Sequence, residues 1–286
     1  MPIIFDKVSY IYGQNTPFEN KALDKIDLTI RENEITGLIG QTGSGKSTIA
    51  QLCNGLYKPN EGTVTVDGVD INADKKKKKE NFFRVGLVFQ YPEYQLFEDT
   101  VGHDIAYGPK NMGLSEEEIA RRVADAARFV GLTDEELKKS PFDISGGQRR
   151  RAAIAGIIAM EPEYLILDEP AAGLDPHGRD DILTKLKAYQ REKKIAVVII
   201  SHSMEDMAKY CDRIIVLGKN GVYKSGTKAE IFEDPMALKK MGLSVPQITK
   251  MVYRAKELGV GFERPLYTVD AAFQDIMKML SDGGAV

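Results

Sequence analysis

Cysteine is scarce in this chain: Cys53 and Cys211 are the only two among 286 residues, and both stand among apolar neighbours. Two isolated cysteines form neither a disulfide framework nor a metal-ligand cluster. Their scarcity excludes the class of small disulfide-stabilised secreted domains and is typical of a protein from a reduced, cytosolic compartment.

Long hydrophobic runs are also missing. The longest apolar run, AAIAGIIAM at residues 152–160, falls far short of the roughly 20 residues that a membrane-spanning helix needs. The N-terminal MPIIFDKVSY has no basic segment followed by an apolar core, so we expect no secretory signal there. If the protein works at a membrane, we expect partner subunits to hold it there.

Charge of one sign does not dominate either. The net charge of -3 provides no basic field that would attract nucleic acid. Lys75 to Lys79 form a run of five lysines, which we interpret as a solvated loop at a strand–helix junction; a patch for lipid or nucleic acid is the alternative. Hydrophobic residues at 43% and charged residues at 28% are ordinary for a globular protein with a sizeable core.

The hydrophobic pattern predicts an α/β fold. Alternation at residues 3–12, 23–30 and 62–68 predicts antiparallel strands, whereas residues 164–170 and 195–202 predict buried strands of a parallel sheet. Two shorter apolar strands are predicted within residues 34–40 and 84–89, and a hairpin within 212–226, with its turn around Asn220 and Gly221.

Helices dominate two other segments. Residues 91–160 are predicted to be helical, with capping-box pairs Ser115/Glu118 and Thr133/Glu136. Beyond residue 232, apolar residues recur at helical spacing and predict two amphipathic helices in a tail. This tail either packs onto its own domain or forms a subunit interface. The helical positions of the tail are Ile248, Met251, Val252, Ala255, Leu258, Val269, Ala272, Phe273, Ile276, Met277 and Leu280.

A phosphate-binding loop is the strongest motif. GQTGSGKST fits the pattern G-x-x-x-x-G-K-[ST] in full and stands between a predicted strand and a predicted helix. Backbone N–H groups of such a loop surround phosphates, Lys46 supplies a cation, and the Ser47 hydroxyl is placed to bind Mg²⁺. The nucleotide-binding candidates are Gly40, Gln41, Thr42, Gly43, Ser44, Gly45, Lys46, Ser47 and Thr48.

Two adjacent acids end the buried strand YLILD. Asp168 is predicted to hold Mg²⁺ directly or through water, and Glu169 to orient and deprotonate the attacking water. A helix N-terminus is the alternative explanation for the two acids. His202 ends another buried strand on the same edge of the sheet, where α/β proteins bind ligands, and we expect it to contact the γ-phosphate.

Two further side chains are expected near the phosphates. Gln90 follows a predicted strand, so its amide is a candidate for Mg²⁺ or the nucleophilic water. Tyr12 is a candidate for stacking on adenine, with ordinary packing as the alternative. His103 and His177 lack such a context, and we interpret both as surface or packing residues.

A second anion-binding sequence lies about 100 residues after the first. In DISGGQRRR, Ser145, Gly146 and Gly147 bring backbone N–H groups together where a helix begins. A single nucleotide does not need two such sites. We assign no catalytic role to Arg149, Arg150 or Arg151.

Together, the phosphate loop, FQYPEYQLF, DISGGQ, LILDEP, AGLDP and ISHS resemble the ATPase subunits of ABC transporters in order and spacing, over residues 3–232. FQYPEYQLFEDTV, DIAYGPKNMG, ISHSMEDMA and VPQITK are similar to the ATPases of energy-coupling factor (ECF) transporters, and more to the second of their two ATPases than to the first. The resemblance implies a nucleotide-binding domain at 1–232 with a helical subdomain at about 91–160. A helical tail at 233–286 would then be a possible dimerisation element.

The family also implies a mechanism. Two ATPases face each other head to tail, so that Ser145, Gly146, Gly147 and Gln148 close over the ATP that the partner's phosphate loop holds. Asp175, in AGLDP, would lie across the same interface. Catalysis would fall to Glu169, His202 and Lys46, and Mg²⁺ to Ser47, Gln90 and Asp168.

The implied function is ATP hydrolysis that powers uptake of vitamins or other micronutrients. Implied partners are a second ATPase, a transmembrane coupling subunit and interchangeable substrate-binding membrane subunits, at the cytoplasmic face of the membrane and without nucleic acid. A homodimer remains open beside the heterodimer. Ile144 and His103 depart from the family pattern, where leucine and an acid are usual, and neither removes a catalytic group.

Three alternatives remain. One is the ATPase of a cobalt or nickel importer of the same group. Another is a soluble ABC ATPase of DNA repair or translation, although the long coiled coils or second ATPase domain of those proteins are missing. The third is a module that holds ATP without hydrolysing it, which the intact Glu169 and His202 argue against.

One apolar stretch follows Gln90. YPEYQLFE, residues 91–98, places Tyr91, Tyr94, Leu96 and Phe97 in a loop-like segment. In the resembled family this region borders a groove for a helix of the membrane subunit, which suits aromatic side chains; internal packing is the alternative.

Overall fold

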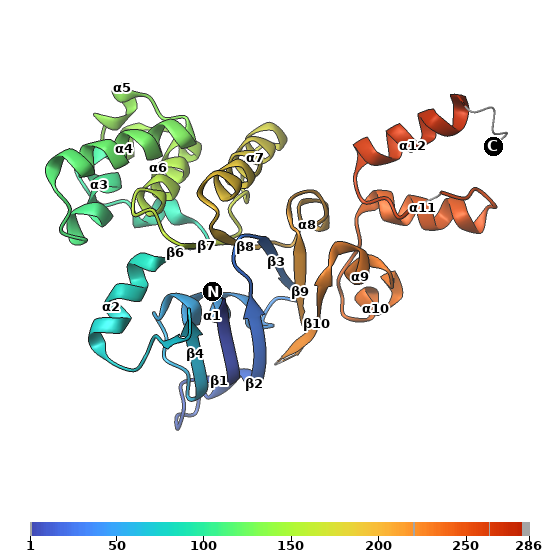
Figure 1. The fold of residues 1–286 in the computed structure, drawn as a ribbon, viewed down its shortest axis with the longest axis horizontal. Coiled ribbons are helices and arrows are strands. Elements are labelled where there is room, and N and C mark those ends of the chain that lie inside the picture. Colours follow the sequence, from blue (N-terminus) through green and yellow to red (C-terminus); the bar gives the residue numbers. More distant parts are fainter. Residues whose placement is uncertain (1, 220, 263, 282–286) are drawn as a thin grey trace.

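The computed structural model describes residues 2–219, 221–262 and 264–281. Figure 1 shows a central body of strands, with a group of helices on one side and the C-terminal helices on the other. A six-stranded sheet has the order β10-β9-β3-β8-β7-β6, and a four-stranded sheet has the order β2-β1-β4-β5. This is the mixed α/β fold that the sequence predicts.

The six-stranded sheet forms the centre of the body. Its strands are β3 (Ile35–Gly40), β6 (Val85–Val88), β7 (Tyr164–Asp168), β8 (Ala196–Ile200), β9 (Arg213–Leu217) and β10 (Val222–Thr227). The five strands from β9 to β6 are parallel, and β10 pairs antiparallel with β9. Asn220, in the predicted hairpin turn, lies outside the described residues.

Both faces of this sheet are covered, which explains why its strands are apolar almost throughout. In β7, Leu165 and Leu167 belong to one core cluster together with residues of the helices, whereas Ile166 belongs to a second cluster. That second cluster is shared with helix α1 (Lys46–Asn54) and the four-stranded sheet. Core side chains therefore pack against both faces of this sheet.

The four-stranded sheet is antiparallel and consists of β1 (Ile3–Tyr12), β2 (Asn20–Ile30), β4 (Glu61–Val66) and β5 (Val69–Asp70). In β2, buried and exposed residues alternate over most of the strand, as the period of two predicts. The apolar face of this sheet packs against α1, in the core cluster that both share.

The predicted helical segment contains short 3₁₀ turns at Pro92–Gln95 and Pro141–Asp143 and four helices. Thr133 forms a complete capping box with Glu136, whereas Ser115 accepts the Glu118 backbone N–H as a simple N-cap. The helices are α3 (Val101–Asn111), α4 (Glu116–Val130), α5 (Asp134–Leu137) and α6 (Gly146–Ile158).

The run of five lysines is helical, so the prediction of a loop is wrong. It begins α2 (Lys75–Arg84), where Asp74 is the N-cap and accepts the Lys77 backbone N–H. Lysine has a good helix propensity, and the Asp74 cap starts the helix directly before the run.

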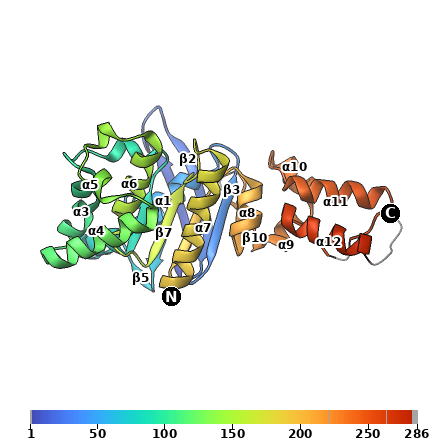
Figure 2. The same ribbon diagram turned by 90° about the horizontal axis from the view of Figure 1, so that it is seen from above.

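The remaining helices of the described residues are α7 to α12. Helices α7 (Pro176–Lys193) and α8 (Met204–Tyr210) pack on the six-stranded sheet. Helices α9 (Lys228–Phe232) and α10 (Pro235–Lys240) lead to the tail, whose two predicted helices are α11 (Gln247–Glu257) and α12 (Val269–Ser281). Figure 2 shows the tail standing apart from α3–α6, with the sheet between them. Among the described residues, no helix is both long and apolar enough to cross a membrane.

Candidate active site

The phosphate loop connects the end of β3 to the start of α1. Gly45 has φ of 95° and caps α1; a Cβ there would lie 2.6 Å from Cδ2 of Leu23, so only glycine fits both the backbone and the packing. Lys46 is buried, and its Nζ donates to the carbonyl oxygens of Gly40 at 2.8 Å and Gln41 at 3.0 Å. Burial lowers the pKa of Lys46, against the opposing effect of Asp168 and Glu169.

Asp168 reaches the phosphate loop from the end of β7. The Ser47 hydroxyl donates to Oδ2 of Asp168 at 2.7 Å, although 121 residues separate the two in sequence. Both side chains offer oxygen ligands of the kind that Mg²⁺ prefers. The parallel pairing of β3, β8 and β7 produces this meeting.

Glu169 follows directly and is held with φ of 52°, a left-handed conformation that is uncommon for a residue other than glycine. Its Oε1 atom is buried, has no hydrogen-bond partner in the described chain, and lies 3.7 Å from Nε2 of His202. Burial raises the pKa of Glu169, and Asp168 adds to the rise while His202 opposes it. A carboxylate with a raised pKa and an unpartnered oxygen is suited to accept a proton from a bound group.

A cavity of about 260 Å³ joins these groups. It brings together most of the predicted nucleotide-binding and catalytic side chains from five separate segments. Of the loop residues, Gly40, Gln41 and Ser44 are not among the lining residues. The lining residues are Tyr12, Asn20, Ala22, Thr42, Gly43, Gly45, Lys46, Ser47, Thr48, Gln90, Asp168, Glu169 and His202.

Tyr12 lines the cavity. Its hydroxyl hydrogen-bonds with Oγ1 of Thr48 at 2.9 Å, and its ring packs edge-on against Tyr10 and Tyr57. Gln90 is exposed and lines the same cavity. Stacking of Tyr12 on adenine stays a prediction.

The second anion-binding sequence, Ser145 to Gln148, does not line the cavity. Ser145 is the N-cap of α6 and forms a capping box with Gln148, whose Oε1 accepts the Ser145 backbone N–H at 2.7 Å. Gly147 has open space where a Cβ would stand. Asp175 also lies outside the cavity lining; it caps α7 and accepts the Gly178 backbone N–H at 2.8 Å.

The sequence did not predict that Arg150 is buried beside the catalytic segment. It is buried, and its guanidinium donates to the backbone carbonyl of Glu169 at 2.7 Å and to that of Ala172. Burial lowers its pKa. This side chain ties α6 to the segment that holds Glu169 in its left-handed conformation.

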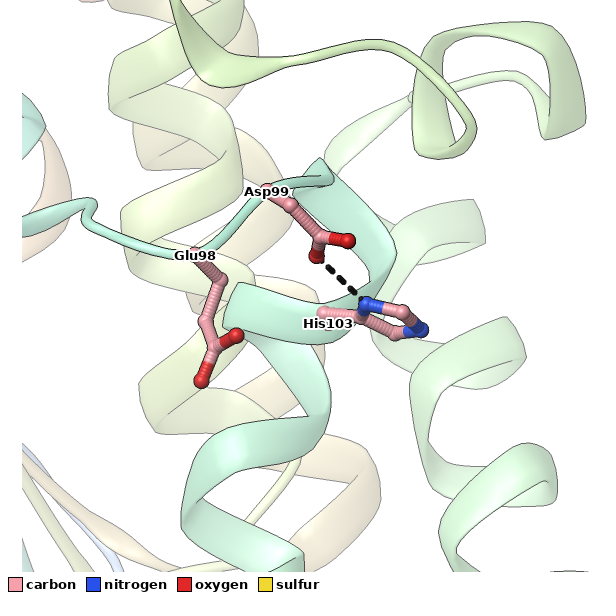
Figure 3. Close-up of side chains that lie close together, drawn as sticks. All are labelled: Glu98, Asp99 and His103. Carbon is pink, nitrogen blue, oxygen red and sulfur yellow. Dashed lines mark hydrogen bonds and ion pairs between the residues drawn. The ribbon is translucent and has the colours of Figure 1, made fainter.

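His103 is exposed, as expected, and belongs to a group of possible metal ligands with Glu98 and Asp99. Their ligand atoms lie within 4.8 Å of one another. Figure 3 shows His103 pointing toward Asp99, and its Nδ1 lies 2.6 Å from Oδ1 of that residue, while the Glu98 side chain is directed elsewhere. The His103–Asp99 pair accounts for the arrangement, so we assign no metal here.

Comparison with known proteins decides the family. A family model described as ABC transporter matches residues 23–172. The chain is 50% identical to the energy-coupling factor transporter ATP-binding protein EcfA2 of Clostridium acetobutylicum, over 98% of each chain. This chain belongs to the ABC transporter ATPases of the energy-coupling factor type.

Solved structures agree. The structure of cbiO1 from Clostridium perfringens, part of the ABC transporter complex cbiONQ, superposes with a TM-score of 0.74 at 35% identity, covering 88% of this chain and 98% of that one. A dimeric post-hydrolysis state of the ATP-binding cassette MJ0796, bound to ADP and Pi, has a TM-score of 0.71 at 27% identity, covering 79% and 98%. The predicted fold, and the prediction of an ATP-hydrolysing ECF transporter component, are confirmed.

Proposed function

We propose that this chain hydrolyses ATP in its cavity with Mg²⁺ and thereby powers uptake through membrane partners. Gly40 to Thr48 surround the phosphates, Lys46 balances their charge, and His202 contacts the γ-phosphate. Glu169 receives the proton of the attacking water, and Tyr12 stacks on adenine.

The observation that supports this most is that the phosphate loop and Glu169 line one cavity, where Oε1 of Glu169 has no hydrogen-bond partner among the described residues. Ser47, Asp168 and Gln90 would hold Mg²⁺, and the hydroxyl and carboxylate oxygens fit such an ion. When bound, the ion supplies charge neutralisation at the phosphates.

The second anion-binding sequence, Ser145 to Gln148, binds the ATP of a partner ATPase in this proposal. Ser145 to Gln148 lie outside the chain's own cavity, and the start of α6 offers backbone N–H groups to an anion there. We assign Asp175 to the same interface. The dimeric form of MJ0796 supports a paired arrangement. A heterodimer with a similar but distinct ATPase is the arrangement we favour.

The chain divides into two functional parts in this proposal. Residues 1–232 form the nucleotide-binding domain, with the helical subdomain at about 91–160, and residues 233–286 form a dimerisation tail. Helix α12 supports this, because its large apolar side chains are exposed along one face at helical spacing: Val269, Phe273, Ile276, Met277 and Leu280.

A groove of about 390 Å³ supports docking on a membrane subunit. We call it the helix groove; its walls come from α2, α3, α6 and the segment after Gln90, and they include Phe82, Phe83, Phe97, Tyr107, Ala153 and Ile157. An apolar groove of this kind accepts the apolar face of a helix. The partner is a transmembrane coupling subunit that works with separate substrate-binding subunits, so the chain lies at the cytoplasmic face of the membrane.

Vitamins or similar micronutrients are the proposed substrate class. The second candidate is a cobalt or nickel importer of the same group. The higher identity to EcfA2, 50% against 35%, favours the ECF importer.

Copurification tests the proposal. The tagged chain, extracted from native membranes in mild detergent, is expected to bring a second ATPase and an integral membrane subunit, and the complex to hydrolyse ATP. Recovery of the chain alone from the soluble fraction, or with nucleic-acid-processing proteins, would contradict it.

A further inference from the structure

We propose that the N-terminal half of α2 is a docking surface for an anionic lipid bilayer. The inference rests on the proposed function, because it takes the orientation of α2 from the docking of the helix groove on a membrane subunit. The surface consists of Lys75, Lys76, Lys77, Lys78 and Lys79, which we call the lysine surface.

The lysine surface is exposed and nearly uncompensated. All of its members but the half-buried Lys78 are exposed. In the described part of the chain, Lys76 is the one member whose ammonium pairs with a carboxylate, Glu80 at 4.0 Å. The chain as a whole has a net charge of -3, so these five positive charges are a local concentration against the average.

The position of the run within the helix is electrostatically unfavourable. Three of the lysines occupy the first turn of α2, where the positive end of the helix dipole disfavours cations. Lys75 and Lys79 are also like charges at spacing i,i+4, which destabilises a helix. Locally, the Asp74 cap and the Lys76–Glu80 ion pair offset these effects. An opposing negative surface relieves both costs.

Geometry identifies a bilayer as that surface. Phe82 and Phe83, in the second half of α2, line the helix groove. A helix rises about 1.5 Å per residue, so Lys79 and Lys75 lie roughly 5 Å and 10 Å along the axis from Phe82. In Figure 1, α2 lies on the side of the molecule that carries α3 and α6, which form the other walls of the groove. In the proposed complex, a groove that receives a helix of a membrane subunit lies on the side of the bilayer, and α2 forms one of its walls.

Clusters of four to eight basic residues on a helix are typical of segments that bind anionic lipids. Attraction of this kind acts within about a Debye length, roughly 8–10 Å at physiological salt. The lysine surface would therefore attract the chain to an anionic membrane, in addition to the contact between the helix groove and the membrane subunit.

Vesicle cosedimentation of the purified full chain tests the inference without any membrane subunit. Vesicles of phosphatidylcholine with about 30% phosphatidylglycerol should bind the chain at least about tenfold more than pure phosphatidylcholine vesicles. This preference should disappear when the ionic strength rises from about 0.05 M to about 0.5 M. Equal binding to both vesicles, or none to either, overturns the inference.

A set of variants locates the binding. Changing the four exposed members together, Lys75→Gln, Lys76→Gln, Lys77→Gln and Lys79→Gln, should lower the preference at least about tenfold, while arginine at the same positions should preserve it. Glutamine keeps good helix propensity, so α2 should remain folded. The matched control removes four exposed tail charges, Lys239→Gln, Lys240→Gln, Lys250→Gln and Lys256→Gln, and should bind vesicles as the wild type does.

Two outcomes separate this inference from the proposed function. The four-glutamine α2 variant should hydrolyse ATP and copurify with the membrane subunit in detergent at wild-type levels. If it also binds vesicles like the wild type, the lysine surface is not a lipid site, although the transport function stands. If the lysines instead bind duplex nucleic acid and not vesicles, the inference is wrong.

Discussion

Nε2 of His202 lies 3.7 Å from Oε1 of Glu169, and that buried oxygen has no hydrogen-bond partner in the described chain. The two residues follow the ends of neighbouring parallel strands, since β7 pairs with β8. The sheet thus places a carboxylate whose pKa is raised and an imidazole side chain at one point of the cavity. A water between Glu169 and a γ-phosphate would be oriented by both.

Glu169→Gln should retain ATP binding and slow hydrolysis. The amide keeps the shape of the carboxylate and cannot accept the proton, and loss of a general base typically costs about 10²–10⁴ in rate. Single-turnover hydrolysis and nucleotide affinity measured on the same preparation check this, and an ATP-bound closed dimer should accumulate. Turnover within about twofold of the wild type would remove Glu169 from the role.

Lys46→Ala and Ser145→Arg should disable different nucleotide sites. Lys46 lies in the chain's own cavity, so its loss should abolish ATP binding there. Ser145 lies outside it, so an arginine should leave that binding intact and block hydrolysis at the partner's loop. Site-resolved nucleotide binding in the assembled pair distinguishes the two lesions. Loss of nucleotide binding by the isolated Ser145→Arg chain would refute the cross-subunit arrangement.

Arg150→Lys should slow hydrolysis more than it weakens ATP binding. Lysine keeps the positive charge but lacks the planar guanidinium that donates hydrogen bonds to the backbone carbonyls of Glu169 and Ala172. Each buried carbonyl left without a donor costs about 1–3 kcal/mol of stability. The exposed Arg128→Lys in α4 is the control and should leave both activity and melting temperature unchanged. Wild-type kcat in a stably folded Arg150→Lys protein would show that Arg150 does not position Glu169.

Phe273→Ser with Met277→Ser should weaken pairing of the ATPases. Both side chains are exposed on the apolar face of α12, so a change there leaves the core intact. The dissociation constant of the nucleotide-free pair should rise, while ATP binding to the separate chain stays at the wild-type level. Analytical ultracentrifugation at several concentrations measures this. An unchanged dissociation constant would mean that the tail is not an interface.

Much of the fold and of the cavity was accessible from sequence, because short-range patterns determine both. The apolar run of β7 predicted a strand buried on both faces. GQTGSGKST predicted the phosphate loop after β3 and the helix α1. Since parallel strands end at one edge, the meeting of Asp168 with Ser47 followed from topology.

Two features were not accessible, for different reasons. Three consecutive arginines point in different directions around a helix, so the sequence alone could not show that Arg150 is the one that α6 turns inward. For the lysines, a run of like charges suggested a loop, whereas Asp74 and helix propensity prevailed over the repulsion. In both cases tertiary context or capping, rather than composition, determined the outcome.

Tyr94→Ala with Phe97→Ala should weaken assembly with the membrane subunit. Of the apolar residues after Gln90, Leu96 packs against the core, whereas Tyr94 is 84% exposed and Phe97 61% exposed. Phe97 lines the helix groove and packs edge-on against Tyr107. The exposure of Tyr94 and Phe97 argues against internal packing as the main role of their rings. A contact with a partner subunit is the remaining explanation for these two aromatic side chains.

The double variant should fold normally and keep the basal ATP hydrolysis of the purified ATPase pair, because neither side chain lines the nucleotide cavity. Aromatic hot spots at the centre of an interface are worth about 2 kcal/mol or more each, so complex recovery and substrate uptake should fall sharply. The matched control is Phe18→Ala with Tyr223→Ala, two rings that are 86% and 53% exposed on other elements and should leave assembly unchanged. Hydrolysis, complex recovery and uptake are measured on one preparation of each variant. Normal assembly and uptake in Tyr94→Ala/Phe97→Ala would refute docking at the helix groove, and a misfolded double variant would show that the rings support the domain itself.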